Sequence, residues 1–175
     1  DLEPAWNAIG NVPLILEGFV HFEREVSIVG VRSTTGEVRA YPIVANTHKN
    51  GILRVTLAPH RHPALQKAAE ICLKRVLRHF EYAGVLTLEF FVAKGRLVAN
   101  EMAPRVHNSG HWTIEGAVTS QFENHLRAIL GLPLGDTSPS GHCAMINFIG
   151  TLPERDAILA LPGVHWHDYG KEPRP

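Results

Sequence analysis

The chain has 175 residues, of which 45% are hydrophobic and 19% are charged, a composition typical of a globular domain. Lys and Arg together number 17, as do Asp and Glu, so the chain has no net charge at pH 7. This balance argues against a general nucleic-acid binder and against a protein that binds acidic membranes, because both need a basic surface.

Cysteine and histidine usage narrows the class further. The two cysteines, Cys72 and Cys143, are far apart and give no disulfide framework, so a reducing, cytoplasmic location is expected. The chain has 11 histidines, but no pair has the spacing of a helical zinc motif, and we expect no zinc site. The sequence contains no apolar run of membrane length.

The first part of the chain predicts antiparallel strands. Pro13–Val20 is an apolar run that is typical of a strand. Glu25–Ser33 and Gly36–Val44 alternate apolar and polar residues on either side of a turn, which predicts a hairpin with one solvated face. Asn46–Gly51 is polar and predicts a connecting loop before a strand at Ile52–Ala58.

Helical signals follow. Pro63–Phe80 carries apolar residues at i, i+3 and i+4 spacing, which predicts an amphipathic helix. Thr113–Gly131 also predicts helical structure, with a fresh start at Ser120, because Ser120 and Glu123 resemble a capping box. Gly135–Gly141 has the composition of a linker. The remaining pattern predicts a strand, a short helix and a second strand, at His142–Gly150, Pro153–Leu161 and Val164–Tyr169.

Two acids mark the strand pair within Gly84–Trp112 as the centre of the chain. A tight turn at Lys94-Gly95 joins two apolar strands, because Gly tolerates a positive φ there. Glu89 interrupts the first strand, and Asn100 and Glu101 close the second.

The length of this turn decides whether the acids share a face, because side chains alternate along a strand. A two-residue turn pairs Ala93 with Arg96, which puts the two acids on opposite faces. A three-residue connection pairs Ala93 with Leu97, which sets Glu89 opposite Glu101 on one face. Facing like charges repel, so the second arrangement needs a cation between them, such as Mg²⁺ that also holds phosphates. The alternative is two solvated acids on the exposed face of a hairpin.

The segment after this hairpin is rich in groups that recognise anions. Arg gives a planar fork for phosphate or carboxylate, and small residues can offer backbone N–H groups. Within eight positions the segment holds Arg105, His107, Asn108, Ser109, Gly110 and His111.

These strings resemble a known family. LEFF at Leu88–Phe91 and NEMAPRVHNSGHWT at Asn100–Thr113 resemble the metal-binding strand pair and substrate loop of the ATP-grasp ligases, and within them the 5-(carboxyamino)imidazole ribonucleotide synthase family. The resemblance implies an α+β fold, with an antiparallel sheet flanked by helices and the beginning of a small β-rich C-terminal domain. Residues 1–134 would be the C-terminal part of the ATP-grasp domain, 135–141 a linker, and 142–175 the start of the small domain.

The resemblance also implies an activity. The family carboxylates 5-aminoimidazole ribonucleotide with bicarbonate in purine biosynthesis, through carboxyphosphate, and uses ATP and Mg²⁺. The expected partners are therefore these small molecules and a second copy of the chain as a homodimer, with neither nucleic acid nor membrane involved.

The site residues follow by position from the same resemblance. Glu89 and Glu101 would hold the metal, and Arg105 and His107 would be catalytic. His107 could act as a base or as a hydrogen-bonding group, and His48 could contact the nucleotide or belong to an ordinary connecting turn. ATP would contact Glu17, Gly18, Phe19, Val20, Glu25, His48, Asn100 and Glu101. The other substrates would contact Asn108, Ser109, His111, Lys171 and Arg174.

Complete members of this family carry an N-terminal nucleotide-fold domain and a Gly-rich lid loop, for which the residues before Glu17 leave no room. We therefore expect this chain to be part of a longer enzyme and to have little or no ligase activity alone. One alternative is another ATP-grasp ligase, such as formate-dependent glycinamide ribonucleotide transformylase, although the HNSGHWT string argues against it. The other alternative is a non-catalytic nucleotide-binding module.

Overall fold

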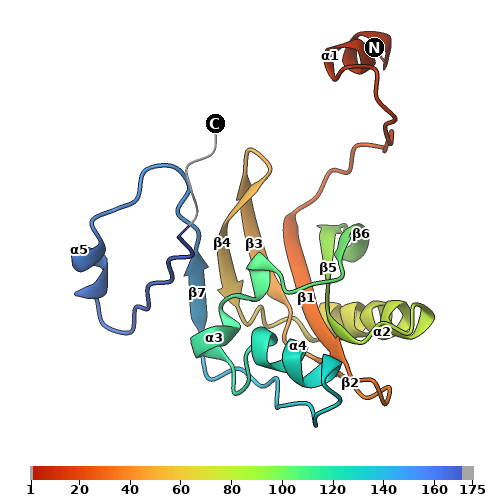
Figure 1. The fold of residues 1–175 in the computed structure, drawn as a ribbon. Coiled ribbons are helices and arrows are strands. Elements are labelled where there is room, and N and C mark those ends of the chain that lie inside the picture. Colours follow the sequence, from red (N-terminus) through yellow and green to blue (C-terminus); the bar gives the residue numbers. More distant parts are fainter. Residues whose placement is uncertain (1, 171–175) are drawn as a thin grey trace.

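The computed structural model describes residues 2–170 and has one antiparallel sheet of seven strands at its centre. The strand order is β6-β5-β1-β3-β4-β7, and β2 pairs with β1 beside this path (Figure 1). The strands are β1 (Arg24–Arg32), β2 (Val38–Ala40), β3 (Val44–Lys49), β4 (Ile52–Ala58), β5 (Gly84–Ala93), β6 (Arg96–Ala103) and β7 (Cys143–Ile146). The helices are α1 (Leu2–Ala8), α2 (Pro63–His79), α3 (Thr113–Gly116), α4 (Gln121–Ile129) and α5 (Arg155–Leu159), and a 3₁₀ turn spans Asn108–Gly110.

One face of the sheet is covered by α2. Side chains alternate along β1, so Val26 and Ile28 point towards α2 and pack with Leu73 and Leu77 of that helix. Gly30 on the same face lies so close to the helix that a Cβ atom there would be 2.2 Å from Cδ2 of Leu73. The close approach of helix and sheet therefore depends on Gly at this position.

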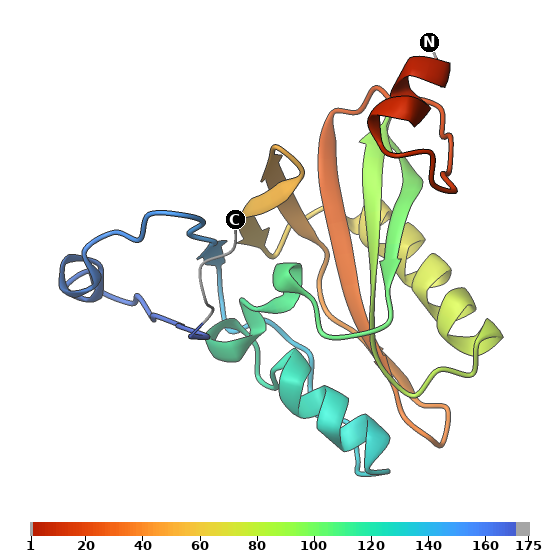
Figure 2. The same cartoon turned by 45° about the horizontal axis from the view of Figure 1, so that its top comes forward.

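The opposite face is covered at one end by α3, α4 and the segment that contains Trp112. Figure 2 shows α2 and α4 on opposite sides of β1 and β5. Val29 and Val31 of β1 belong to this second cluster, together with Tyr41 and Trp112. β1 is thus buried on both faces, and the solvated face predicted for it is wrong, because helices cover both sides of the strand.

Several elements follow the sequence pattern closely. The strands predicted at Glu25–Ser33 and Ile52–Ala58 are confirmed as β1 and β4, and the helix predicted at Pro63–Phe80 is confirmed as α2. A helix does begin afresh after Ser120, whose hydroxyl accepts the backbone N–H of Glu123 at 3.1 Å. In these elements the local signal and the tertiary packing agree.

The N-terminal prediction is wrong in two respects. Leu2–Ala8 forms helix α1, where no element was predicted, and residues 13–20 form no strand. The side chains of Ile15 and Phe19 are 88% and 84% exposed. The described edges of the sheet are β6 and β7, and neither pairs with this run. An apolar run without a neighbouring strand cannot form a ladder, whatever its propensity.

The region before β4 also differs from the prediction. The single strand expected at Gly36–Val44 is split into β2 and the start of β3, and Pro42, which has no N–H to donate, lies in the break. The loop expected at Asn46–Gly51 is wrong, because β3 continues to Lys49. The turn consists of Asn50 and Gly51 alone, with φ of 54° and 72°. Positive φ at both positions suits a tight hairpin turn.

The C-terminal part joins the same sheet. β7 pairs with β4, while Val164–Tyr169 forms no strand, because no strand of residues 2–170 lies alongside it to complete a ladder. The segment predicted as a linker packs on its surroundings: the Thr137 hydroxyl donates to the carbonyl of Ala40 at 2.8 Å. The domain division at residues 135–141 stays a prediction. Within residues 2–170, no helix combines the length and the hydropathy needed to cross a bilayer.

The α2 contact generates a stability prediction. Leu73→Ala should lower the free energy of unfolding by about 2–5 kcal/mol, because Leu73 is fully buried and the tight packing around Gly30 leaves a cavity. Urea denaturation measures the change. Ile71→Ala on the same helix is the control, because Ile71 is 59% exposed, and we expect a change within about 0.5 kcal/mol. Equal losses from both variants would contradict this account of the core.

Candidate active site

A β-bulge brings the two acids of the central hairpin together. β5 and β6 are joined by a two-residue turn that sets Ala93 opposite Arg96. The register shifts further along, so that Phe90 faces Ala99 while Glu89 faces Glu101. Asn100 is the extra residue between them. The structure thus has the two-residue turn of one predicted alternative and the shared face of the other.

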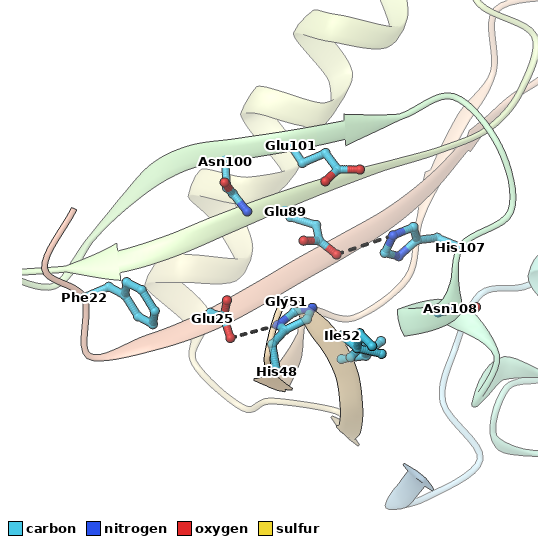
Figure 3. Close-up of a pocket in the computed structure, with 11 residues that line it drawn as sticks. Phe22, Glu25, His48, Gly51, Ile52, Glu89, Asn100, Glu101, His107 and Asn108 are labelled. Atoms are coloured by element: carbon cyan, nitrogen blue, oxygen red, sulfur yellow. Dashed lines mark hydrogen bonds and ion pairs between the residues drawn. The ribbon is translucent and has the colours of Figure 1, made fainter. Parts of the chain in front are cut away.

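The two acids line a cavity of about 500 Å³. The cavity lies between residues of β1, β3, β4, β5 and β6 and the segment that follows β6. Figure 3 shows that Glu89 and Glu101 lie beside Asn100, and that Glu25 and His48 lie nearby from the neighbouring strands. The lining residues are Phe22, Glu25, His48, Gly51, Ile52, Leu53, Glu89, Asn100, Glu101, His107 and Asn108.

The sequence of each strand explains why the site lies at this end. On the face that carries α4, successive inward positions of β1 change from Val31 and Val29 to Ser27 and then to Glu25. The chain therefore buries apolar groups under α4 and presents ionisable groups beyond it. The same change runs through Val44, Asn46 and His48 on β3, and through Val85, Thr87 and Glu89 on β5.

Glu89 is under electrostatic strain that a cation would relieve. Burial is the main cause that raises the pKa of Glu89 above its ordinary value, and the charges of Glu101 and Glu25 raise it further. His48 and Arg105 act in the opposite direction, with His48 the stronger of the two. The free site therefore disfavours a second negative charge.

The donor set fits Mg²⁺ that is bound together with a phosphate ligand. Carboxylate and amide oxygens are hard ligands, and Mg²⁺ in nucleotide sites commonly uses one or two carboxylates plus substrate phosphates. In the part of the chain that the structure describes, no group of three or more His, Cys, Asp or Glu side chains is arranged to hold a metal ion. Glu89 and Glu101 therefore match a site in which protein carboxylates and ligand phosphates together bind the metal ion. They do not match a site in which protein side chains alone bind it.

His107 is held as a neutral side chain. Its Nδ1 accepts the backbone N–H of Ser109 at 3.3 Å and lies 2.9 Å from the Ser109 hydroxyl. Its Nε2 lies 3.4 Å from Oε1 of Glu89. Burial lowers the pKa of His107 to about 4, and the charges of Arg105 and His48 contribute. At neutral pH the contact with Glu89 is therefore not an ion pair. The choice between a base and a hydrogen-bonding group for His107 stays a prediction.

Glu25 and His48 form a second contact within the cavity. Oε2 of Glu25 lies 2.8 Å from Nδ1 of His48, and both side chains are partly buried. His48 belongs to strand β3, so the connecting-turn alternative for this residue is wrong.

The remaining predicted residues are spread around the cavity. Arg105 is exposed and does not line it; its Nη1 donates to the carbonyl of Val106 at 3.0 Å. Ser109 is buried behind His107, and His111 lies 2.7 Å from the Tyr169 hydroxyl. Four predicted ATP contacts, Glu17, Gly18, Phe19 and Val20, lie outside the cavity lining, and their role stays a prediction. Lys171 and Arg174 lie outside the described residues.

Some residues of the site were not predicted. Phe22 lines the cavity and stacks on Phe91, with ring centroids 4.4 Å apart and planes inclined by 14°. Gln121 clamps the backbone of His107 from both sides: its Oε1 accepts the N–H at 3.1 Å, and its Nε2 donates to the carbonyl at 2.8 Å. A polar residue at a buried position of an amphipathic helix was the available signal for Gln121.

Comparisons with known proteins identify the family. The chain matches the model of the ATP-grasp domain over residues 1–122 and that of the phosphoribosylaminoimidazole carboxylase C-terminal domain over residues 143–175. It is 56% identical over 171 residues to an N5-carboxyaminoimidazole ribonucleotide synthase from Pseudomonas aeruginosa, a match that covers 98% of this chain and 47% of that protein. The chain thus spans about half the length of the curated relatives it matches.

Solved structures give the same result. The N5-carboxyaminoimidazole ribonucleotide synthetase of Thermus thermophilus superposes with a TM-score of 0.94 at 58% identity, covering 99% of this chain and 49% of that one. The Aspergillus clavatus N5-carboxyaminoimidazole synthase, solved with ADP and 5-aminoimidazole ribonucleotide, superposes with a TM-score of 0.72 at 33% identity. That match covers 76% of this chain and 37% of the other.

The electrostatics of Glu89 can be tested in the metal-free chain. Glu101→Gln should lower the pKa of Glu89, because it removes a negative charge that disfavours ionisation. Arg105→Gln should raise this pKa, because it removes a positive charge. A carboxyl ¹³C NMR titration measures both, with Glu37→Gln, next to β2, as the control that should leave Glu89 unchanged. Shifts of the same sign from the two site variants would show that the charges do not act on Glu89 as described.

Proposed function

Because the chain belongs to the ATP-grasp family and resembles N5-carboxyaminoimidazole ribonucleotide synthases over nearly its whole length, we propose that it serves the ATP-dependent carboxylation of 5-aminoimidazole ribonucleotide. The observation that carries the proposal is the bulge that sets Glu89 opposite Glu101 at the edge of a cavity. A pair of facing carboxylates is unfavourable alone and becomes favourable with a cation and a phosphate chain between them.

The chemistry requires an activated carboxyl group. Bicarbonate is a poor electrophile, so one of its oxygens first attacks the γ-phosphorus of ATP, which forms carboxyphosphate and releases ADP. The exocyclic amine of the ribonucleotide then captures the carboxyl carbon, and phosphate leaves. When bound, Mg²⁺ would supply positive charge that offsets the negative charge developing on the phosphates during transfer.

The residues of this chain have separate tasks in that scheme. Glu89 and Glu101 would hold the metal, and the Asn100 amide lies beside them. Arg105, which keeps its charge at all relevant pH values, can turn from the surface to steady carboxyphosphate with its planar fork. Glu25 is placed at the cavity to accept hydrogen bonds from ribose hydroxyls, which suits a carboxylate.

His107 acts as a hydrogen-bonding group that orients Glu89. Asn108 lines the cavity beside it and offers an amide to the substrates. A cytoplasmic location stays a prediction from the cysteine pattern, and a homodimer stays a prediction of the resemblance.

Nucleotide binding gives the first test. Mg·ADP titrated calorimetrically into the chain should bind, and Glu101→Gln should weaken binding by roughly 10- to 100-fold, because a charged ligand contact contributes about 1.5–3 kcal/mol. Glu115→Gln, on α3 outside the cavity lining, is the control and should bind as the parent chain does. Equal affinity for the parent chain and Glu101→Gln would favour a non-catalytic nucleotide-binding module.

Substrate identity needs the complementary half of the enzyme. This chain can replace the matching segment of the Pseudomonas aeruginosa relative, and the chimera should release ADP only when bicarbonate and 5-aminoimidazole ribonucleotide are both present. Glu101→Gln in the chimera should lower the rate at least about 100-fold, because metal-held charge stabilises the transition state. The isolated chain should show little or no turnover. Turnover of the chimera with glycinamide ribonucleotide and formate instead would assign the transformylase activity.

A further inference from the structure

A line of buried polar side chains runs across one face of the sheet to His107. Thr56, Asn46, Ser27 and Ser109 come from β4, β3, β1 and the 3₁₀ turn, and none is more than 7% exposed. The distances between successive polar atoms are 2.9 Å from Thr56 to Asn46, 2.9 Å from Asn46 to Ser27, and 2.8 Å from Ser27 to Ser109. The last step, from Ser109 to Nδ1 of His107, is 2.9 Å. We call these four side chains the polar relay.

The hydrogen bonds of the polar relay all donate in one direction, from Thr56 towards Ser109. The Thr56 hydroxyl donates to Oδ1 of Asn46, and Nδ2 of Asn46 donates to the Ser27 hydroxyl. A hydroxyl has one proton to donate, and Ser27 donates its proton to Ser109. The proton of the Ser109 hydroxyl is then available for Nδ1 of His107.

A second donor points to the same nitrogen and adds to the effect of the Ser109 hydroxyl. The backbone N–H of Ser109 points to Nδ1 of His107 at 3.3 Å, and a backbone N–H can only donate. Nδ1 is therefore an acceptor, and in the neutral imidazole the proton lies on Nε2. Nε2 is the nitrogen that lies 3.4 Å from Oε1 of Glu89 (Figure 3).

The position of the ring is fixed as well as its tautomer. Gln121 holds both the backbone N–H and the carbonyl of His107. Gly110 allows this approach, because a Cβ atom there would lie 2.4 Å from Oε1 of Gln121. The imidazole is thus held by its backbone on one side and by Nδ1 on the other, which leaves Nε2–H as the group that meets the acid.

We propose that the polar relay locks His107 as an Nε2–H donor aimed at Glu89, and that Ser27, Asn46 and Thr56 are positioning residues of the site although none of them lines the cavity. The role of Glu89 as a metal ligand rests on the proposed function. The tautomer of His107, and the hydrogen bonds that select it, do not rest on it. A purely structural relay would satisfy buried polar groups without selecting the tautomer of His107.

The test is ¹⁵N NMR of the His107 side chain in the metal-free, nucleotide-free chain at neutral pH. The parent chain should show protonated Nε2 and unprotonated Nδ1. Ser27→Ala should shift the tautomer ratio roughly fivefold towards Nδ1–H, the effect expected when one neutral hydrogen bond that orients Ser109 is lost. Thr56→Val, which keeps the shape of the side chain, should shift the ratio in the same direction by less and serves if Ser27→Ala does not fold.

Thr87→Val is the matched control. Thr87 is fully buried, it lies on β5 at the same face, and its hydroxyl has no hydrogen-bond partner within residues 2–170. This variant removes a buried hydroxyl outside the polar relay and should leave the ratio unchanged. A parent chain with protonated Nδ1, or a Ser27→Ala ratio equal to that of Thr87→Val, would overturn the proposal. Neither result depends on ATP or metal, so a failed Mg·ADP titration and a failed tautomer test remain separate outcomes.

Discussion

The site depends on one extra residue in β6. With a two-residue turn and no bulge, the register would continue from Ala93 and Arg96, and Glu101 would stand opposite Leu88. Leu88 belongs to the cluster that packs against α2, so the carboxylate would be directed into an apolar core. The bulge at Asn100 instead turns Glu101 to the face of Glu89. Facing carboxylates repel each other, and the charge of Glu101 adds to the burial that raises the pKa of Glu89. Such conflicts concentrate at functional sites.

One face of the sheet has two parts, an apolar core under α4 and a group of ionisable side chains beyond it. Under α4 the inward positions of β1, β3 and β5 are apolar and form a rigid core with Trp112 and Tyr41. Beyond it, the same positions are occupied by Glu25, His48 and Glu89. The polar relay lies at the boundary, where neither water nor apolar packing would satisfy Ser27 and Asn46. Side chains that approach the site are therefore supported by buried hydrogen bonds.

The parts of the fold that could be predicted are those where local pattern and packing agree. The periodicity of α2, the strand expected at Ile52–Ala58 and the cap at Ser120 are local predictions, and all three are confirmed. Residues 13–20 and Val164–Tyr169 had strand-like patterns, but a strand needs a partner, and partners are set by the whole chain. The second half of β3 was mistaken for a loop because it is rich in polar residues, among them Asn46 and His48, which face the site.

In the site, too, some residues could be predicted from the sequence and others could not. Seven of the sixteen residues expected at the site line the cavity, and four of them, Asn100, Glu101, His107 and Asn108, come from β6 and the segment that follows it. The bulge was not predictable, since the sequence allowed two registers that differ by one residue. Ser27, Thr56 and Gln121 were missed because a single buried polar residue looks ordinary until its neighbours are known.

The charge state of His107 affects how well Glu89 can bind a cation. An imidazolium 3.4 Å from this carboxylate would neutralise it and would repel a divalent cation bound to the same oxygens. Burial and the nearby Arg105 hold the pKa of His107 near 4, so the ring gives Glu89 a directed contact and no competing charge. Glu89 and Glu101 can then both offer negative charge to a metal, while His48 and Arg105 moderate their repulsion from the rim. A neutral histidine behind the acid pair is thus compatible with the shared metal ion that we propose for this site.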